Sequence, residues 1–135
     1  MIKSILKINI VANPFQPYCT SPHIIVNIKG KTVYAVIDTG AGINLMSREL
    51  AESLNLNVLK KCNGEKLVFG NGNNAILNKE VKFNLKIDPS IYLIDATLIN
   101  NPPFDLLIGM KWLLDNNAII NLKKKSVYLD LQIKI

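Results

Sequence analysis

The residues of this chain that could do chemistry reduce to carboxylates. Histidine occurs once, at His23, so a Ser–His or Cys–His nucleophile would depend on that residue alone. It opens an expected strand beside Pro22, where a structural or exposed role is favoured. No spacing of His, Cys, Asp and Glu matches a metal site, so we expect neither a metal nor another cofactor.

Asp38 is the candidate catalytic acid. An expected apolar strand leads directly into Asp38-Thr39-Gly40-Ala41-Gly42, and a carboxylate at the end of a buried strand is costly unless something uses it. Small residues let two such loops approach closely, and two carboxylates about 3 Å apart share one proton. One acid could then activate water while the other protonates the carbonyl oxygen of a peptide bond. The tripeptide alone also fits a turn with an Asx-type hydrogen bond.

This two-acid mechanism sets the expected oligomeric state. The sequence contains a single Asp-Thr/Ser-Gly motif, whereas the mechanism needs two acids. A symmetric homodimer supplies the same loop twice across its twofold axis. An extended peptide would bind by strand addition, and a mobile hairpin would close over it.

Length and composition predict one globular domain. The chain has 135 residues, of which 49% are hydrophobic and 19% charged. No apolar run is long enough for a membrane span, and charges interrupt the N-terminal residues, which argues against a signal peptide. Cys19 and Cys62 fit no disulfide framework, so we expect reduced thiols in a cytoplasmic protein, free or within virus-like particles.

The net charge of +6 leaves two interpretations open. Lys123-Lys124-Lys125 could mark a basic barrel that binds nucleic acid, but no basic helix or aromatic–basic interleaving accompanies it. A solvated turn between two strands is the favoured interpretation, and a nucleic-acid partner is not expected.

The coarse pattern predicts a mostly β protein: a small closed β-barrel with two short helices. Residues 1–22 form an N-terminal arm or lead-in, with a strand near 5–11 and then three prolines, and the main domain covers 23–135. Ser47 is expected to cap one helix, and Met110 to start the other, which stops at Asn116-Asn117. Strands are expected at 23–28, 31–37, 65–69, 75–77, 81–87, 92–99, 105–109, 118–120, 127–129 and 132–135.

Three motifs in order resemble the retropepsins, the aspartic proteases of retroviruses and retrotransposons, with most likeness to the gypsy-type branch. They are the Ala35–Ala41 signature, the glycine-rich tip Val68–Asn73 at the position of the flap, and the Phe104–Leu113 segment with its apolar-apolar-Gly strand. The resemblance covers roughly residues 23–131. It implies a homodimeric aspartic endopeptidase that processes a polyprotein.

The resemblance also implies roles for individual residues. Asp38 would be the catalytic acid, Thr39 would lock the two active-site loops together, and Gly40 would accept a substrate hydrogen bond. Ala41 would lie beside the substrate, and Gly109 would permit close packing under the catalytic loop. The implied substrate-binding residues are Gly42, Phe69, Gly70, Asn71, Gly72, Leu107 and Ile108.

The sequence departs from the family pattern at three places. Gly42, Ile43 and Lys111 stand where members often carry acids, so the usual acid–arginine support under the active site is not assumed. The lead-in 1–22 could be a pro-sequence, a cover over the dimer edge or an addition. The main rival function is a retropepsin fold without activity, a dimerisation or peptide-binding module that is either domesticated or part of a ubiquitin-pathway shuttle protein.

Overall fold

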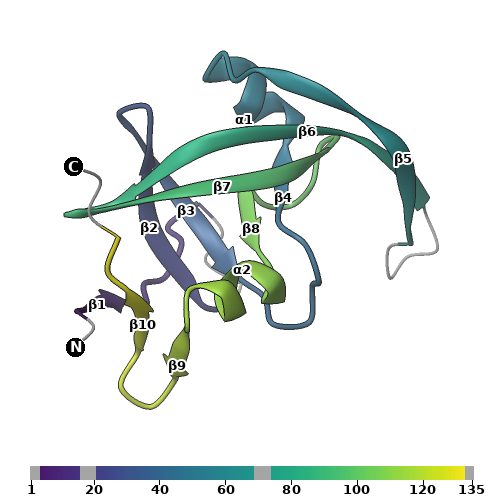
Figure 1. Ribbon diagram of the computed structural model, residues 1–135. Coiled ribbons are helices and arrows are strands. Elements are labelled where there is room, and N and C mark those ends of the chain that lie inside the picture. Colours follow the sequence, from purple (N-terminus) through teal and green to yellow (C-terminus); the bar gives the residue numbers. More distant parts are fainter. Residues whose placement is uncertain (1–3, 16–20, 69–73, 133–135) are drawn as a thin grey trace.

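The computed structural model describes residues 4–15, 21–68 and 74–132 of the chain. Strands wrap around a central core, and the hairpin of β5 and β6 extends away from it (Figure 1). In chain order the elements are β1 (Ile5–Asn9), β2 (His23–Ile28), β3 (Lys31–Ile37), β4 (Leu45–Ser47), α1 (Arg48–Ser53), β5 (Val58–Val68), β6 (Asn74–Ile87), β7 (Ser90–Ile99), β8 (Leu106–Ile108), α2 (Met110–Asp115), β9 (Ile119–Asn121) and β10 (Ser126–Asp130).

Six of these strands close into a barrel. The hydrogen-bonded order runs β2, β3, β8, β4, β7 and β6, and β6 returns to β2 through the pair Asn27–Lys86. β5 lies outside this ring and, among the strands that the structure describes, pairs only with β6. The expected mostly β barrel with two short helices is therefore confirmed.

The turn between β2 and β3 sets the register of the strand that leads to Asp38. Lys29 and Gly30 both have positive φ, 51° and 86°, as a two-residue hairpin turn of the primed type requires. Asn27 Oδ1 accepts a hydrogen bond from the Gly30 N–H at 2.9 Å. The turn places Val33, Ala35 and Ile37 of β3 in the barrel core.

The core is built from alternating side chains of the barrel strands. On β6, Val81, Phe83 and Leu85 are buried whereas the residues between them are exposed, which is the period of a half-buried strand. Trp112 on α2 is 7% exposed and meets the Tyr92 ring edge-to-face at 5.3 Å between centroids. Trp112 is therefore a core residue.

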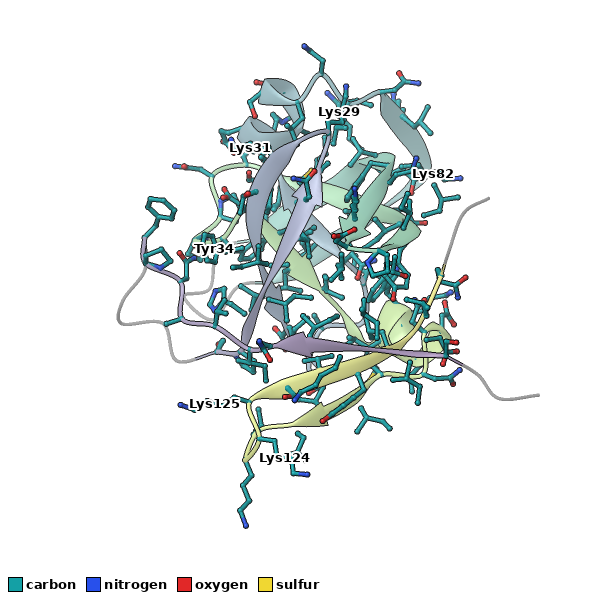
Figure 2. The ribbon with its side chains drawn as sticks, turned by 90° about the vertical axis from the view of Figure 1, so that its left-hand side faces the viewer. Lys29, Lys31, Tyr34, Lys82, Lys124 and Lys125 are labelled. Carbon is teal, nitrogen blue, oxygen red and sulfur yellow. The ribbon has the colours of Figure 1, made fainter. Side chains whose placement is uncertain are left out.

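A second, three-stranded sheet has the order β1–β10–β9. β1 comes from the lead-in segment and pairs with β10 over five residue pairs from Ile5–Asp130 to Asn9–Ser126. The Lys123–Lys125 cluster occupies the exposed turn between β9 and β10, as expected. Figure 2 shows Lys124 and Lys125 at the opposite end of the molecule from Lys29 and Lys31.

Both helices begin where the sequence indicated, and α2 also ends there. Ser47 Oγ accepts from the Leu50 N–H at 3.1 Å and so caps α1. α2 ends at Asp115, followed by Asn116 and by Asn117 in the left-handed region, with φ of 52°. No helix in the described ranges is long and apolar enough to cross a membrane.

The strand boundaries differ from expectation in several places. β4 was not predicted, because three residues show no measurable period. β5 begins at Val58, and β6 is one strand from Asn74 to Ile87 rather than two, because pairing with β5 and β7 carries it through Asn78-Lys79-Glu80. Gln132 lies outside any strand, and the rest of the predicted 132–135 strand falls outside the described residues.

Candidate active site

Asp38 stands at the carboxyl end of β3, immediately beyond the last paired residue. β3 pairs in parallel with β8, and this ladder ends at Ile37 and Ile108. The Asp38 N–H then donates to the Ile108 carbonyl at 3.0 Å, so the backbone of the acid remains attached to β8. Side chains alternate along a strand, so position 38 falls on the same face as Val36.

The loop after Asp38 folds back onto its carboxylate. The Gly40 N–H donates to Asp38 Oδ1 at 2.8 Å, and the Ala41 N–H donates to the Asp38 carbonyl at 3.3 Å. Asp38 is half-buried, while Thr39 and Gly40 are exposed. The carboxylate therefore has a fixed orientation and an open side, as an acid that meets water and substrate requires.

The same loop rests on the start of α2. The Met110 N–H donates to the Ala41 carbonyl at 2.7 Å, and the Lys111 N–H donates to the Gly42 carbonyl at 3.4 Å. A Cβ on Gly109 would lie 2.8 Å from the Ala41 carbonyl oxygen, closer than real Cβ atoms come. The prediction that Gly109 permits close packing under the catalytic loop is confirmed.

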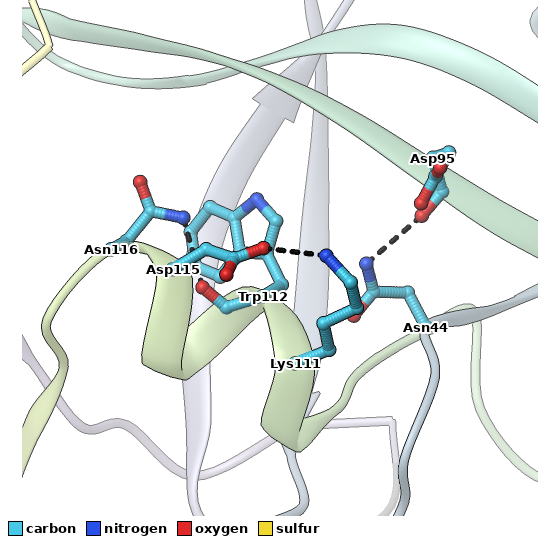
Figure 3. Close-up of polar contacts among 6 residues, drawn as sticks. All are labelled: Asn44, Asp95, Lys111, Trp112, Asp115 and Asn116. Carbon is cyan, nitrogen blue, oxygen red and sulfur yellow. Dashed lines mark hydrogen bonds and ion pairs between the residues drawn. The ribbon is translucent and has the colours of Figure 1, made fainter.

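Asn44 is a buried polar residue at this site that sequence reasoning missed. It is 7% exposed and precedes β4. Its Oδ1 accepts from the Gly109 N–H at 2.8 Å, and its Nδ2 donates to the Asp95 carbonyl at 2.9 Å (Figure 3). The sequence offered one signal for this role: Asn44 stands between the apolar residues Ile43 and Leu45, and a carboxamide that is buried with them needs hydrogen-bond partners.

Charged residues lie on the exposed side of α2. Lys111 Nζ contacts Asp115 Oδ2 at 2.9 Å, an (i, i+4) pair on the helix surface (Figure 3). The hydrogen bond and charge of Asp115 raise the pKa of Lys111, and the charge of Asp95 adds to this. Lys111 thus stays protonated, and its side chain points along the helix surface.

A second apolar cluster lies beside the Asp38 loop, separate from the barrel core. Its buried members are Val36, Leu45, Ile99 and Leu107, and the half-buried Ala41, Ile43 and Phe104 pack against it. Val36 and Leu107 are neighbours across the β3–β8 ladder. The structure thus brings the predicted site residues Ala41 and Leu107 together next to Asp38.

The other predicted site residues lie in three different settings. Ile108 is fully buried in the barrel core, on the opposite face of β8 from Leu107. Thr39 lines a hollow of about 440 Å³ with residues of α2 and β9, and Gly42 is exposed. Phe69, Gly70, Asn71 and Gly72 lie outside the described residues.

His23, the single histidine, has a partner of its own. His23 is buried at 1% exposure, and its Nδ1 lies 2.8 Å from the Ser21 carbonyl. It therefore has a structural position rather than an exposed one. Within the described ranges, no three His, Cys, Asp or Glu side chains group as metal ligands would.

Sequence comparisons place the chain beside known proteins. A family model described as "gag-polyprotein putative aspartyl protease" matches residues 24–115. Protein DDI1 homolog 2 of Mus musculus is 26% identical over 107 residues, which cover 79% of this chain and 27% of that protein. The Danio rerio protein of the same name is also 26% identical over 107 residues, or 79% of this chain and 26% of its own. The chain therefore spans about a quarter of the length of these curated relatives.

Three solved structures share the fold. The retroviral protease-like domain of Ddi1 from Leishmania major matches with a TM-score of 0.66 and 18% identity, over 87% of this chain and 96% of that one. A retropepsin-like aspartic protease from Rickettsia conorii gives 0.62 and 16%, over 97% and 95%. EIAV protease, complexed with the inhibitor HBY-793, gives 0.56 and 17%, over 78% and 93%. The barrel is thus of the retropepsin type.

Proposed function

This chain belongs to the family of gag-polyprotein aspartyl proteases, and we propose that it is an aspartic endopeptidase that works as a homodimer. The observation that carries the proposal is the setting of Asp38. Its backbone is held by Ile108, its carboxylate is oriented by the Gly40 N–H, and one side remains open. The bond from Gly40 alone would fit an Asx-type turn, but the loop is also joined to β8 through the Asp38 N–H and to α2 through the Ala41 carbonyl.

The proposed reaction uses one Asp38 from each subunit. The ionised Asp38 takes a proton from water, whose oxygen attacks the carbonyl carbon of the peptide bond. The protonated Asp38 of the second subunit gives its proton to the carbonyl oxygen, which produces a tetrahedral diol. The first Asp38 then passes the proton it took from water to the nitrogen, and the C–N bond breaks. The second Asp38 takes a proton from a diol hydroxyl as the carboxyl product forms, so the pair again holds one proton.

The surface proposed for the second subunit lies beside Thr39. Leu114, Ile119 and Leu122 are 67%, 59% and 66% exposed. Leu114 and Ile119 line the hollow that also contains Thr39, and Ile119 borders a neighbouring hollow with Ile5 on β1. An apolar surface next to the catalytic loop would bring two copies of Asp38 together across a twofold axis.

The proposed substrate is an extended segment of a polyprotein with apolar side chains at the cleavage site. The cluster around Val36 and Leu107 offers apolar side chains next to Asp38, and an extended peptide exposes alternate side chains to such a pocket. The β5–β6 hairpin would close over the peptide, with the predicted contacts of Phe69, Gly70, Asn71 and Gly72 at its tip. In this proposal the dimer acts in the cytoplasm or inside virus-like particles.

The experiment compares wild type with Asp38→Asn on a peptide library, from mildly acidic to neutral pH and over a range of protein concentrations. Asn keeps an acceptor for the Gly40 N–H but cannot exchange the proton. Asp88→Asn, the same change at an exposed position, is the matched control. We expect cleavage by wild type and the control, inhibition by pepstatin, and a rate that rises faster than linearly with protein concentration.

Two results would contradict the proposal. Cleavage that survives Asp38→Asn would place the activity at another group. A wild-type dimer that cleaves nothing, verified by analytical ultracentrifugation, would favour a silent dimerisation or peptide-binding module instead.

A further inference from the structure

Asn44 joins three segments of the fold at one buried point. Its Oδ1 accepts from the Gly109 N–H at 2.8 Å, where β8 passes into α2. Its Nδ2 donates to the Asp95 carbonyl on β7 at 2.9 Å (Figure 3). Its own carbonyl accepts from the Thr97 N–H at 2.9 Å. The side chain therefore uses one donor and one acceptor at once, which a carboxamide can do and a methyl group or a carboxylate cannot.

The bond to Gly109 acts on the same peptide group that holds Asp38. The Ile108 carbonyl and the Gly109 N–H are the two ends of one peptide unit. The carbonyl accepts from the Asp38 N–H at 3.0 Å, and the N–H donates to Asn44 at 2.8 Å. The unit is planar and rigid, so a rotation that frees one end also displaces the other. One peptide plane thus connects the Asn44 side chain to the backbone of the catalytic acid.

The loop between Asp38 and Asn44 has few other attachments. Asp38 begins it and Asn44 ends it, and between them the Ala41 and Gly42 carbonyls accept from the first turn of α2. Gly109 lies under this loop with no room for a side chain. A fixed 108–109 peptide therefore holds the start of the loop through Asp38. It also holds Gly109, against which the middle of the loop packs.

We propose that Asn44 is a positioning residue for Asp38, an inference that rests on the proposed proteolytic function. Its two hydrogen bonds set the plane of the Ile108–Gly109 peptide and so the position from which the Asp38 carboxylate meets water and substrate. The carboxamide does this while carrying no charge itself. Its effect on the reaction passes through the backbone, since Asn44 is buried and its side-chain hydrogen bonds to Gly109 and Asp95 are both with backbone groups.

Asn44→Asp and Asn44→Ala separate positioning from general stability. A protonated carboxyl at position 44 keeps both hydrogen bonds, whereas the ionised form loses the donor to the Asp95 carbonyl. We therefore expect kcat/KM of Asn44→Asp, as a ratio to wild type, to be close to one at acidic pH and to fall as pH rises. Asn44→Ala should lose roughly 10–100-fold in kcat/KM at every pH, because small misplacements of reacting groups have effects of this size.

Two further measurements make the test specific. Asn84→Asp is the same change at an exposed position of β6 and should give a flat ratio to wild type across pH. Amide hydrogen exchange, measured on the folded dimer, should show the Gly109 N–H exchanging faster in Asn44→Ala than in wild type. This exchange experiment needs no enzymatic activity.

The outcomes distinguish failure of this inference from failure of the proposed function. An active wild type with a pH-independent ratio for Asn44→Asp, or with unchanged kcat/KM per folded dimer in Asn44→Ala, would overturn the positioning role. An unchanged Gly109 exchange rate would also overturn it, since the bond would not restrain the peptide. An inactive wild type would overturn the proteolytic function itself, with or without faster Gly109 exchange.

Discussion

Gly109 lies directly against Ile43: a Cβ atom on Gly109 would be 2.5 Å from the Ile43 carbonyl oxygen. The obstacle is backbone, which cannot rotate away as the end of a flexible side chain can. The start of α2 and the loop after Asp38 can pack this closely only because position 109 carries no side chain.

Gly109→Ala should therefore destabilise the fold and displace the loop after Asp38. Overpacking of this kind typically costs about 1–3 kcal/mol of unfolding free energy. Urea denaturation followed by tryptophan fluorescence would measure it, with Trp112 as the probe on α2. Gly42→Ala is the matched control for stability, because a Cβ there meets nothing within 4 Å. Equal stability of the two variants would contradict the close packing.

The proposed dimer surface predicts a concentration-dependent loss of activity in Ile119→Lys. A lysine in an apolar interface leaves a charge that must be desolvated, so we expect the dimer dissociation constant to rise at least about tenfold, or roughly 1.4 kcal/mol. Sedimentation velocity over a concentration series gives the dissociation constant directly. Leu93→Lys is the control: Leu93 is 74% exposed on β7 and lines neither of the two hollows at Ile119. Dimerisation unchanged in Ile119→Lys would place the interface elsewhere.

From the environment of Tyr92 we expect the folded protein to lose stability at alkaline pH. Burial raises the pKa of its phenol above the ordinary value of 10.0, a hydrogen bond with Ser90 lowers it, and the charge of Asp130 raises it further. Above that ordinary value the unfolded chain ionises first and binds fewer protons, so the stabilising contribution is complete below pH 10 and is lost as pH rises through the folded pKa.

Tyr92→Phe tests this contribution. The variant loses the 2.7 Å hydrogen bond that the phenol donates to the Asp130 carbonyl, which should cost about 1 kcal/mol at neutral pH. It should also show a shallower decline of unfolding free energy in alkaline solution than wild type. Tyr34→Phe, which keeps its ring contact with Phe15, is the control and should follow the wild-type curve. Parallel curves for Tyr92→Phe and wild type would count against the role of Tyr92.

Leu107 and Ile108 predict different phenotypes although they are neighbours. Leu107 belongs to the cluster beside Asp38, so Leu107→Ala should alter which apolar side chains are accepted, by about 10–200-fold in relative kcat/KM. Ile108 is fully buried in the barrel core, so Ile108→Val should cost about 0.5–1.5 kcal/mol of stability and leave the preference unchanged. Cleavage of a peptide library by each variant measures the preference for apolar side chains. An altered preference in Ile108→Val would indicate that Ile108 contacts the substrate.

The sequence by itself predicted the candidate acid and most of the elements. A single Asp38-Thr39-Gly40 at the end of an apolar strand indicated one acid per chain, and alternation along Val81–Ile87 indicated a half-buried strand. Ser47 and Asn116-Asn117 marked helix ends, because capping and left-handed conformations are local properties of a few neighbouring residues. Such signals need no knowledge of distant partners.

The tertiary structure decided what depends on contacts between distant residues. β4 is too short to show a period and exists because β7 and β8 pair with it on both sides. Leu107 and Ile108 look alike in the sequence. Because they lie on opposite faces of β8, Leu107 joins the cluster beside Asp38 and Ile108 joins the barrel core. Asn44 acquires its position from Gly109, which is 65 residues away. The sequence can indicate that a buried carboxamide needs hydrogen-bond partners, but only the closed barrel determines which residues they are.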